Sequence, residues 1–213
     1  MHNRWRDDEA RAAVDRWGQH FGETLALRTY TSRLLGADPS LVLHGGGNTS
    51  AKGAVAVHAG TPIQERVEAL FIKGSGWDLA TIEPQGHPAA RLAPLRRLRA
   101  LATLTDEAMV AAQRTALVDP SAPNPSIECL LHAFLPHAFV DHTHADAVLA
   151  IADQRDAERI CRDLYGRGLV FVPYVMPGFL LAKACAEAFD SVGAEVARVV
   201  VLGQHGVFTF GPD

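Results

Sequence analysis

Two histidines separated by one residue stand at the end of an apolar segment. They are His142 and His144, and they follow the run AFVD that begins at residue 138. On a β-strand, residues i and i+2 point to the same face, so both imidazoles can reach one point. Zinc and similar ions bind imidazole nitrogen, and a catalytic site takes three protein ligands and keeps one position open. Because a half-buried pair bonded to nearby carboxylates is the alternative, the pair alone does not establish a metal site.

A third histidine, His205, lies in the short turn Gln204-His205-Gly206 between two strongly apolar segments. The following glycine gives the backbone freedom to aim the imidazole. We predict that His205 reaches the H-x-H pair from a neighbouring strand and completes a three-histidine metal site. The alternative is a turn histidine that is exposed to solvent.

Glu128 is the carboxylate that we place beside the three histidines. Asn124-Pro125 is typical of a helix N-cap and first helical position, and it precedes the segment SIECLLHAFL. Glu128 then falls in the first turn, where the helix dipole favours a negative charge. Without the histidines, Glu128 would be no more than a good first-turn residue.

Two glycine-rich segments each follow a predicted strand and are typical of anion-binding loops. The first is GGGNTS at residues 45–50, and the second is KGSG at residues 73–76. Glycines let backbone N–H groups converge on an anion, and hydroxyl, amide and lysine side chains add donors and charge. Neither segment matches the Walker A pattern or the GxGxxG dinucleotide pattern. Together with a metal site, they favour binding of a phosphate.

The elements that must position these residues alternate between helix and strand. Hydrophobic periodicity and turn residues predict helices at 7–17, 23–35, about 92–102, 106–117, 125–135, 145–152, 156–165 and 178–189, and strands at 41–44, 54–58, 70–73, 138–144, 169–175, 197–203 and 207–210. The order lacks the regular rhythm of a doubly wound sheet. We therefore predict an α/β fold with a mostly antiparallel or mixed sheet and helices on its faces.

Composition is that of an ordinary globular domain. The chain has 213 residues, 48% of them hydrophobic, and a formal net charge of −4. This charge gives no reason to expect nucleic acid or an anionic membrane as a partner, and no apolar run is long enough for a spanning helix or a signal peptide. We expect a cytoplasmic protein whose three scattered cysteines are reduced. Because Gly211-Pro212-Asp213 follows a strand at once, we expect residues 1–213 to be a single domain cut from a longer protein.

These motifs, in this order, resemble the class II aldolase/adducin family over nearly the whole chain. The resemblance rests on the segments Gly47-Asn48-Thr49-Ser50, Ser75-Gly76, Pro125-Ser126-Ile127-Glu128, His142-Thr143-His144 and His205-Gly206. The phrases KGSGWDLATIEP, HAFLPHAFVDHTHADA and VPYVMPGF are similar to the aldolase segment of bifunctional rhamnulose-1-phosphate aldolase/short-chain dehydrogenases. In those proteins a dehydrogenase segment follows the aldolase segment.

The resemblance implies a three-layer α/β/α sandwich and a metal-dependent lyase of carbohydrate metabolism, here of rhamnose catabolism. The expected substrate is L-rhamnulose 1-phosphate, which would be cleaved to dihydroxyacetone phosphate and L-lactaldehyde. A divalent ion, Zn²⁺ or alternatively Mn²⁺ or Co²⁺, would be held by His142, His144 and His205, and Glu128 would be the acid/base. The phosphate would be bound by Gly47, Asn48, Ser50, Lys73, Ser75, Gly76 and Ser126. A homo-oligomer, commonly a tetramer, is also implied, with no membrane or nucleic acid as partner.

Some features depart from the family pattern, and other functions on the same fold stay open. Ile127 replaces a second serine found in fuculose-phosphate aldolases, and we expect Lys73 to compensate for the lost phosphate donor. Relatives also complete the site with residues of a neighbouring subunit. Pentulose-5-phosphate 4-epimerases carry an aspartate at the position of Glu128, which favours the aldolase. A methylthioribulose-phosphate dehydratase and a non-catalytic adducin-like module are the remaining alternatives.

Overall fold

Seven strands form one sheet in the computed structural model, which describes residues 3–58 and 60–212. The strands are β1 (Asn48–Val57), β2 (Glu65–Ile72), β3 (Ala89–Arg91), β4 (Phe139–Thr143), β5 (Leu169–Val172), β6 (Val199–Leu202) and β7 (Gly206–Gly211). They are ordered β3-β2-β1-β4-β7-β6-β5, and every neighbouring pair is antiparallel except β5 and β6. The predicted mixed, mostly antiparallel sheet is confirmed.

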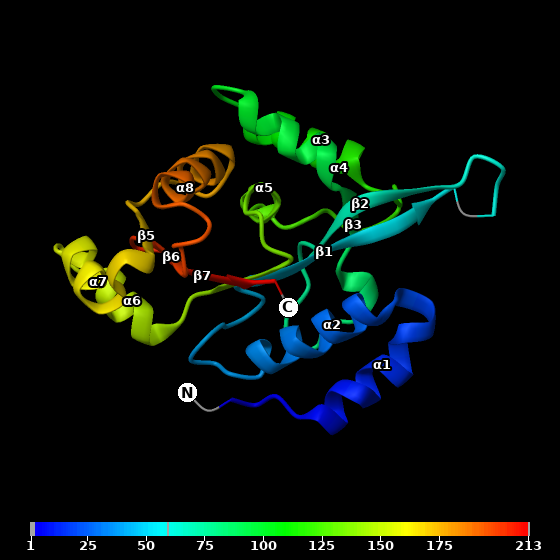
Figure 1. Cartoon of the computed structure of the whole chain (residues 1–213), viewed down its shortest axis with the longest axis horizontal. Coiled ribbons are helices and arrows are strands. Elements are labelled where there is room, and N and C mark those ends of the chain that lie inside the picture. The colour runs from blue at the N-terminus through cyan, green and yellow to red at the C-terminus, as the bar shows by residue number, and fades with distance from the viewer. Residues whose placement is uncertain (1–2, 59, 213) are drawn as a thin grey trace.

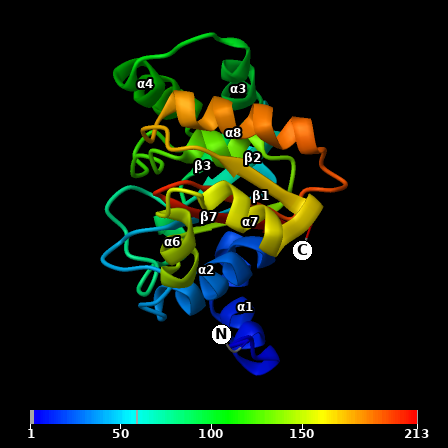
Figure 2. The ribbon, with the colours of Figure 1, turned by 90° about the vertical axis from the view of Figure 1, so that its left-hand side faces the viewer.

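Helices cover both faces of the sheet (Figures 1 and 2). They are α1 (Asp7–Phe21), α2 (Glu23–Gly36), α3 (Leu92–Arg97), α4 (Asp106–Ala116), α5 (Cys129–Phe134), α6 (Asp146–Ala152), α7 (Ala157–Tyr165) and α8 (Phe179–Val192), with short 3₁₀ turns at Pro84–Gly86, Leu98–Ala100 and Gly166–Gly168. Helices α3, α4, α5 and α8 lie on one face, and α1, α2, α6 and α7 lie on the other. This is the expected three-layer α/β/α sandwich.

Side-chain alternation along the strands supplies a hydrophobic core to each face. In β6 all four residues are buried, which is why its sequence is a continuous apolar run. Val200 and Leu202 belong to the core beneath α5 and α8, whereas Val199 and Val201 belong to the core beneath α6 and α7. The sheet is thus buried on both faces at β6, and polar side chains in such buried parts must find partners within the protein.

Helix α2 is tied to the sheet by polar side chains as well as by apolar ones. Arg28 is 2% exposed, and its Nη1 lies 2.7 Å from Oδ1 of Asp141 in β4. One turn later, the Ser32 hydroxyl lies 2.7 Å from the hydroxyl of Thr49 in β1. Helix α1 packs its buried face against α2. The helix predicted at 7–17 ends too early, because α1 continues through Gly18 to Phe21 and the packing of its face outweighs the modest cost of one internal glycine.

The chain departs from the predicted elements at the two places that matter most for the site. Residues 41–44 form a turn instead of the predicted strand, and Leu41 and Val42 are buried in two separate apolar clusters. Strand β1 begins at Asn48, six residues before the predicted start, because Asn48 pairs with His142 of β4. This pairing places the first glycine-rich segment directly beside the H-x-H pair.

The predicted helix at 125–135 also begins later, at Cys129. Pro125 forms an isolated β-bridge with Gly74, and the Ser126 N–H donates to the Lys73 carbonyl at 3.0 Å. The backbone of 125–126 is therefore committed to the second glycine-rich segment and cannot open the helix. Among the described residues, no helix is long and apolar enough to cross a membrane.

Candidate metal centre

Three predicted histidines meet where β4 ends beside the turn between β6 and β7. His142 is in β4, His144 follows that strand, and His205 precedes β7, whose Val207 pairs with Thr143. The Nε2 atoms of His142 and His144 lie 3.0 Å apart, and one nitrogen of each of the three rings lies within 4.8 Å of the others. Residues separated by more than sixty positions in sequence thus present three imidazoles to one point.

Backbone and burial hold these imidazoles in the form that binds metals. The Nδ1–H of His142 donates to the Val207 carbonyl at 3.1 Å, which leaves Nε2 with its lone pair directed to the common point. Burial, reinforced by the neighbouring His144, lowers the pKa of His142 to about 3. Burial also lowers the pKa of His205 to about 4. Both rings are therefore neutral at neutral pH and need not lose a proton to bind an ion.

Gly206 is required for this close approach. A Cβ at this position would lie 2.9 Å from His142 Cε1, 3.0 Å from His144 Cδ2 and 2.5 Å from the Thr143 carbonyl oxygen. No real Cβ approaches other atoms so closely, so a side chain here would displace two of the three rings. The glycine after His205 therefore makes room for the site, in addition to the backbone freedom for which it was singled out.

Glu128 stands beside the three histidines, at the N-cap position immediately before α5. Its Oε2 lies 3.4 Å from His142 Nε2, and its Oε1 lies 3.4 Å from His205 Nε2. The side chain is 5% exposed, and burial raises the pKa of its carboxyl group, while a hydrogen bond from Asn48 opposes that rise. Sequence analysis placed Glu128 one turn too deep in its helix, but its location beside the histidines is as expected.

The donor set suits a divalent ion such as zinc. Tetrahedral ligands at 2.0–2.1 Å from an ion lie about 3.3 Å from one another, and the spacing of the three imidazoles brackets this value. Within the described ranges 3–58 and 60–212, Glu128 Oε1 and His205 Nδ1 are buried without any hydrogen-bond partner. Buried polar atoms are almost always bonded, so unpaired ones at a cluster of nitrogen ligands fit a site built for an ion.

A cavity of about 310 Å³ opens beside this cluster. Six of the seven predicted phosphate-binding residues line it, namely Gly47, Asn48, Lys73, Ser75, Gly76 and Ser126. The seventh, Ser50, does not: it is fully buried within β1, and its hydroxyl bonds to His132. The position of Ser50 follows from the early start of β1, because the strand carries the end of the predicted loop away from the cavity.

Lys73 supplies the positive charge of this cavity. Its ammonium group donates to the Gly45 carbonyl at 2.8 Å, which joins the two glycine-rich segments across the cavity. The residue is 5% exposed, and burial lowers the pKa of its ammonium group. A lysine held in a half-enclosed pocket lined by glycines and two hydroxyls is suited to an anion.

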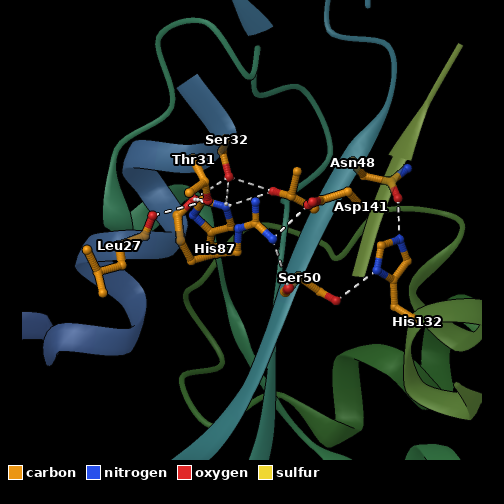
Figure 3. A network of polar contacts seen from close by, with 10 residues as sticks. Leu27, Thr31, Ser32, Asn48, Ser50, His87, His132 and Asp141 are labelled. Atoms are coloured by element: carbon orange, nitrogen blue, oxygen red, sulfur yellow. Dashed lines mark hydrogen bonds and ion pairs between the residues drawn. The ribbon is translucent and has the colours of Figure 1, made fainter. Parts of the chain in front are cut away.

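A buried histidine that sequence analysis did not single out contacts the site from behind. His132 lies within α5 and bonds to Ser50 and to the side-chain oxygen of Asn48 (Figure 3). Asn48 in turn donates from Nδ2 to Glu128 Oε2 at 2.6 Å. A histidine inside the apolar run LLHAF was the available signal, since such a residue must find polar partners when it is buried.

Comparisons with known proteins agree on one family. The family described as Class II Aldolase and Adducin N-terminal domain matches residues 27–213. The chain is 40% identical over 182 residues to an uncharacterized oxidoreductase, YuxG, of Bacillus subtilis, covering 85% of this chain and 26% of that protein. The chain thus spans about a quarter of that curated relative.

Two solved structures have the same fold as this chain. The N-terminal class II aldolase domain of a conserved protein from Thermoplasma acidophilum is 38% identical with a TM-score of 0.83, and the match covers 100% of this chain and 90% of that one. A sugar-phosphate aldolase from Thermotoga maritima shares the fold at 16% identity and a TM-score of 0.62, over 91% of this chain and 87% of that one. On the sequence match and the fold together, the chain belongs to the class II aldolase and adducin family.

Proposed function

We propose that this chain is a metal-dependent aldolase that cleaves a ketose 1-phosphate into dihydroxyacetone phosphate and an aldehyde. The observation that carries the proposal is the meeting of three imidazoles and one buried carboxylate at the edge of a cavity with anion-binding character. Each part has a distinct task in such a reaction. A family member that served only in assembly would have no use for this combination, which argues against an adducin-like module.

The histidines His142, His144 and His205 would hold the metal, for which Zn²⁺ is our first choice and Mn²⁺ or Co²⁺ the alternatives. When bound, a divalent ion supplies Lewis acidity, which stabilises the negative charge that develops when the carbon–carbon bond breaks. No lysine Schiff base is then needed. The chain's own contribution is to hold three lone pairs in place and to exclude bulky side chains through Gly206.

Glu128 is the acid/base in this proposal. Its Oε2 already accepts the Asn48 hydrogen bond, so Oε1 is the oxygen that takes a proton and returns it. Burial raises the pKa of the carboxyl group, and a raised value suits a group that must both accept and release a proton near neutral pH. The carboxylate is thus placed and tuned for proton exchange at the carbon next to the ketone.

The phosphate group would lie in the cavity between the two glycine-rich segments. Lys73 offers charge, Ser75 and Ser126 offer hydroxyls, and Gly47 and Gly76 allow a close backbone approach. The charge of Lys73 compensates for Ile127, which stands where some relatives carry a second serine. Anchoring the phosphate fixes the reacting carbons relative to the metal ligands and to Glu128.

The specific substrate that we propose is L-rhamnulose 1-phosphate, with L-lactaldehyde as the second product. This choice rests on the sequence phrases shared with rhamnulose-phosphate aldolases. A homo-oligomer is part of the same proposal. Its support is the exposed apolar Met176, which precedes the cavity residue Pro177, and Ile127, which lines the cavity and is 42% exposed. A second copy of the chain would cover these side chains and complete the cavity.

The first experiment measures dihydroxyacetone phosphate release by zinc-loaded protein. We expect turnover with L-rhamnulose 1-phosphate, a loss of at least about 1,000-fold in Glu128→Gln, and an unchanged zinc content in that variant. Glu23→Gln is the matched control, because Glu23 is exposed at the start of α2. Near-native turnover in Glu128→Gln would show that the assigned role is wrong. Conversion of a pentulose 5-phosphate to its epimer, with no aldehyde released, would replace the aldolase by an epimerase.

A further inference from the structure

His132 is enclosed by protein on all sides and does not line the cavity. It is 0% exposed and lies in α5, one helical turn after Glu128. There it contacts Asn48, the first residue of β1. Each of its ring nitrogens has one partner. The Nδ1 atom lies 2.8 Å from the Ser50 hydroxyl, and Nε2 bonds to the side-chain oxygen of Asn48 (Figure 3).

The chemistry of these partners fixes the direction of every hydrogen bond. The Asn48 side-chain oxygen can only accept, so His132 Nε2 carries the hydrogen. Burial holds the pKa of His132 well below its usual value, so the ring is neutral and Nδ1 carries no hydrogen. The Ser50 hydroxyl therefore donates to Nδ1. The hydrogen bonds therefore form a row from Ser50 through His132 and Asn48 to Glu128, and each residue donates to the next one toward the carboxylate.

Asn48 is the member of this row that needs to be held. Its amide places Nδ2 at 2.6 Å from Glu128 Oε2, which is a favourable contact only while the nitrogen faces the carboxylate. If the amide turned over, its oxygen would face Glu128 and two acceptors would repel each other. The Nε2–H of His132 prevents this, because it bonds only to the amide oxygen.

The ring of His132 is itself fixed by an aromatic contact. It meets Phe208 edge to face with ring centroids 5.4 Å apart, and Phe208 stacks on the metal-binding candidate His142 at 4.2 Å. His132 therefore touches both halves of the site through one residue each: Asn48 leads to the carboxylate, and Phe208 leads to the imidazoles.

We propose that His132 is a positioning residue for the aldolase reaction, which holds the Asn48 amide with its N–H toward Glu128 and so leaves Oε1 as the free oxygen for proton transfer. This inference rests on the proposed function. It assigns Ser50 to the same row, as the hydroxyl that selects the tautomer of His132, in place of the phosphate-binding role predicted from sequence.

The test compares two substitutions of one residue. The side chain in His132→Gln can donate from its amide nitrogen to Asn48 and accept at its oxygen from Ser50, whereas the side chain in His132→Leu can do neither. We expect kcat to fall about 10- to 100-fold in His132→Leu with KM within about threefold of native, and His132→Gln to recover most of the loss. Zinc content should stay native in both variants. An active native enzyme with an unchanged kcat in His132→Leu would overturn the positioning role and leave the aldolase standing.

A second measurement does not depend on turnover or on the folding of a variant. In ¹⁵N-labelled native protein, with and without zinc, NMR should show His132 with the hydrogen on Nε2 and none on Nδ1. A separate test does use turnover. The substitution Ser50→Ala removes the hydroxyl that selects the tautomer of His132, and it should lower kcat about threefold to tenfold without a change in zinc content. A neutral ring with its hydrogen on Nδ1 would reverse every hydrogen bond of the row, and a charged ring would reverse the bond to Ser50; either result would overturn the proposal. If the native protein cleaves no sugar phosphate, the proposed function fails, and the catalytic part of this inference fails with it.

Discussion

The candidate ligand His142 is aimed by a contact on the side of its ring away from the site. For His142 this contact is the Val207 carbonyl, which takes the Nδ1 hydrogen, together with the face of Phe208. Such outer contacts fix the tautomer and the ring plane, and a ligand held this way loses little freedom when it binds an ion. His144 and His205 are less buried than His142 and line the cavity, so they are the candidate ligands closest to it.

His144→Ala should therefore remove metal binding with little damage to the core. We expect zinc affinity to fall at least about 100-fold, because two imidazoles cannot replace the three ligands that such a site requires. The measurement is zinc content after dialysis, followed by titration against a chelator of known affinity. His58→Ala is the control, since His58 is exposed beyond the far end of β1 and should leave zinc content native. Stoichiometric zinc in His144→Ala would refute the three-histidine site.

Residue types and local spacing were enough to identify the candidate ligands and Glu128. An H-x-H motif at the end of an apolar strand and a histidine in a tight turn are unusual, and they indicate metal binding without knowledge of the fold. The sequence did not place Ser50 away from the cavity and did not single out His132, because the surroundings of both depend on which side of β1 faces α5. That fact follows from the pairing of Asn48 with His142, and sequence alone does not reveal strand register across ninety residues.

Among the elements, the turn between β6 and β7 does most to shape the site. It carries His205 and Gly206, and its neighbour Gly203 sits two residues before the histidine. These two glycines differ in their surroundings. A Cβ on Gly206 would collide with two imidazoles, whereas a Cβ on Gly203 would meet its nearest atoms at an ordinary 3.5 Å. Substitutions at these two glycines therefore distinguish the effect of crowding the imidazoles from the effect of changing any glycine in the turn.

Gly206→Ala should weaken zinc binding at least about tenfold and destabilise the fold by roughly 1–3 kcal/mol, because the new methyl group forces His142 and His144 apart. Gly203→Ala should change zinc affinity less than about threefold. Calorimetric zinc titration and urea unfolding measure the two effects. If both substitutions behave alike, the contact between Gly206 and the imidazoles has no special importance.

Sequence also predicted most of the elements, and its errors have one cause. Helices and strands with clear periodicity were found close to their true positions, as in α8 and β4. The segments 41–44 and 125–128 were assigned wrongly because tertiary contacts override their local signals. Pro125 is bound to Gly74, and the polar residues 48–50 form a strand because buried partners satisfy their side chains. Secondary-structure prediction from local sequence therefore fails in the segments whose backbone and side chains are bonded to other parts of the site.

At the scale of the whole molecule, the fold buries several neutral histidines. His87 bonds weakly to Ser32 and Thr49 beneath α2, and burial lowers its pKa to about 3, the same value as for His142. Burial also holds the pKa of His132 well below its usual value. The three lie on different elements and all face inward. Their shared neutrality couples the free energy of unfolding to pH.

In an unfolded chain these imidazoles titrate near pH 6.5, so between pH 3 and 6.5 the unfolded state binds more protons than the folded state. Stability is therefore fully present above pH 6.5 and is lost as pH falls toward 3. Between pH 7 and pH 5, His87 and His142 should each remove about 2 kcal/mol from the free energy of unfolding, with His132 acting in the same direction. Glu128 opposes them, because burial raises the pKa of its carboxyl group and the folded state then retains a proton that the unfolded state releases.

His205, whose pKa burial lowers to about 4, adds to the loss, so urea unfolding of metal-free protein should show a net loss of at least about 3 kcal/mol at pH 5 relative to pH 7. Lys52, whose pKa is lowered by burial to about 7, is partly uncharged in the folded state at pH 7 and adds a few tenths of a kcal/mol to this loss. Carboxylates such as Asp38, whose pKa values are lowered, titrate below this window. His87→Gln isolates one contribution: its loss between the two pH values should be about 2 kcal/mol smaller than in the native chain, whatever its absolute stability. Equal losses in the two proteins would mean that His87 is not held neutral by the fold, and burial of uncharged imidazoles would no longer explain the acid sensitivity.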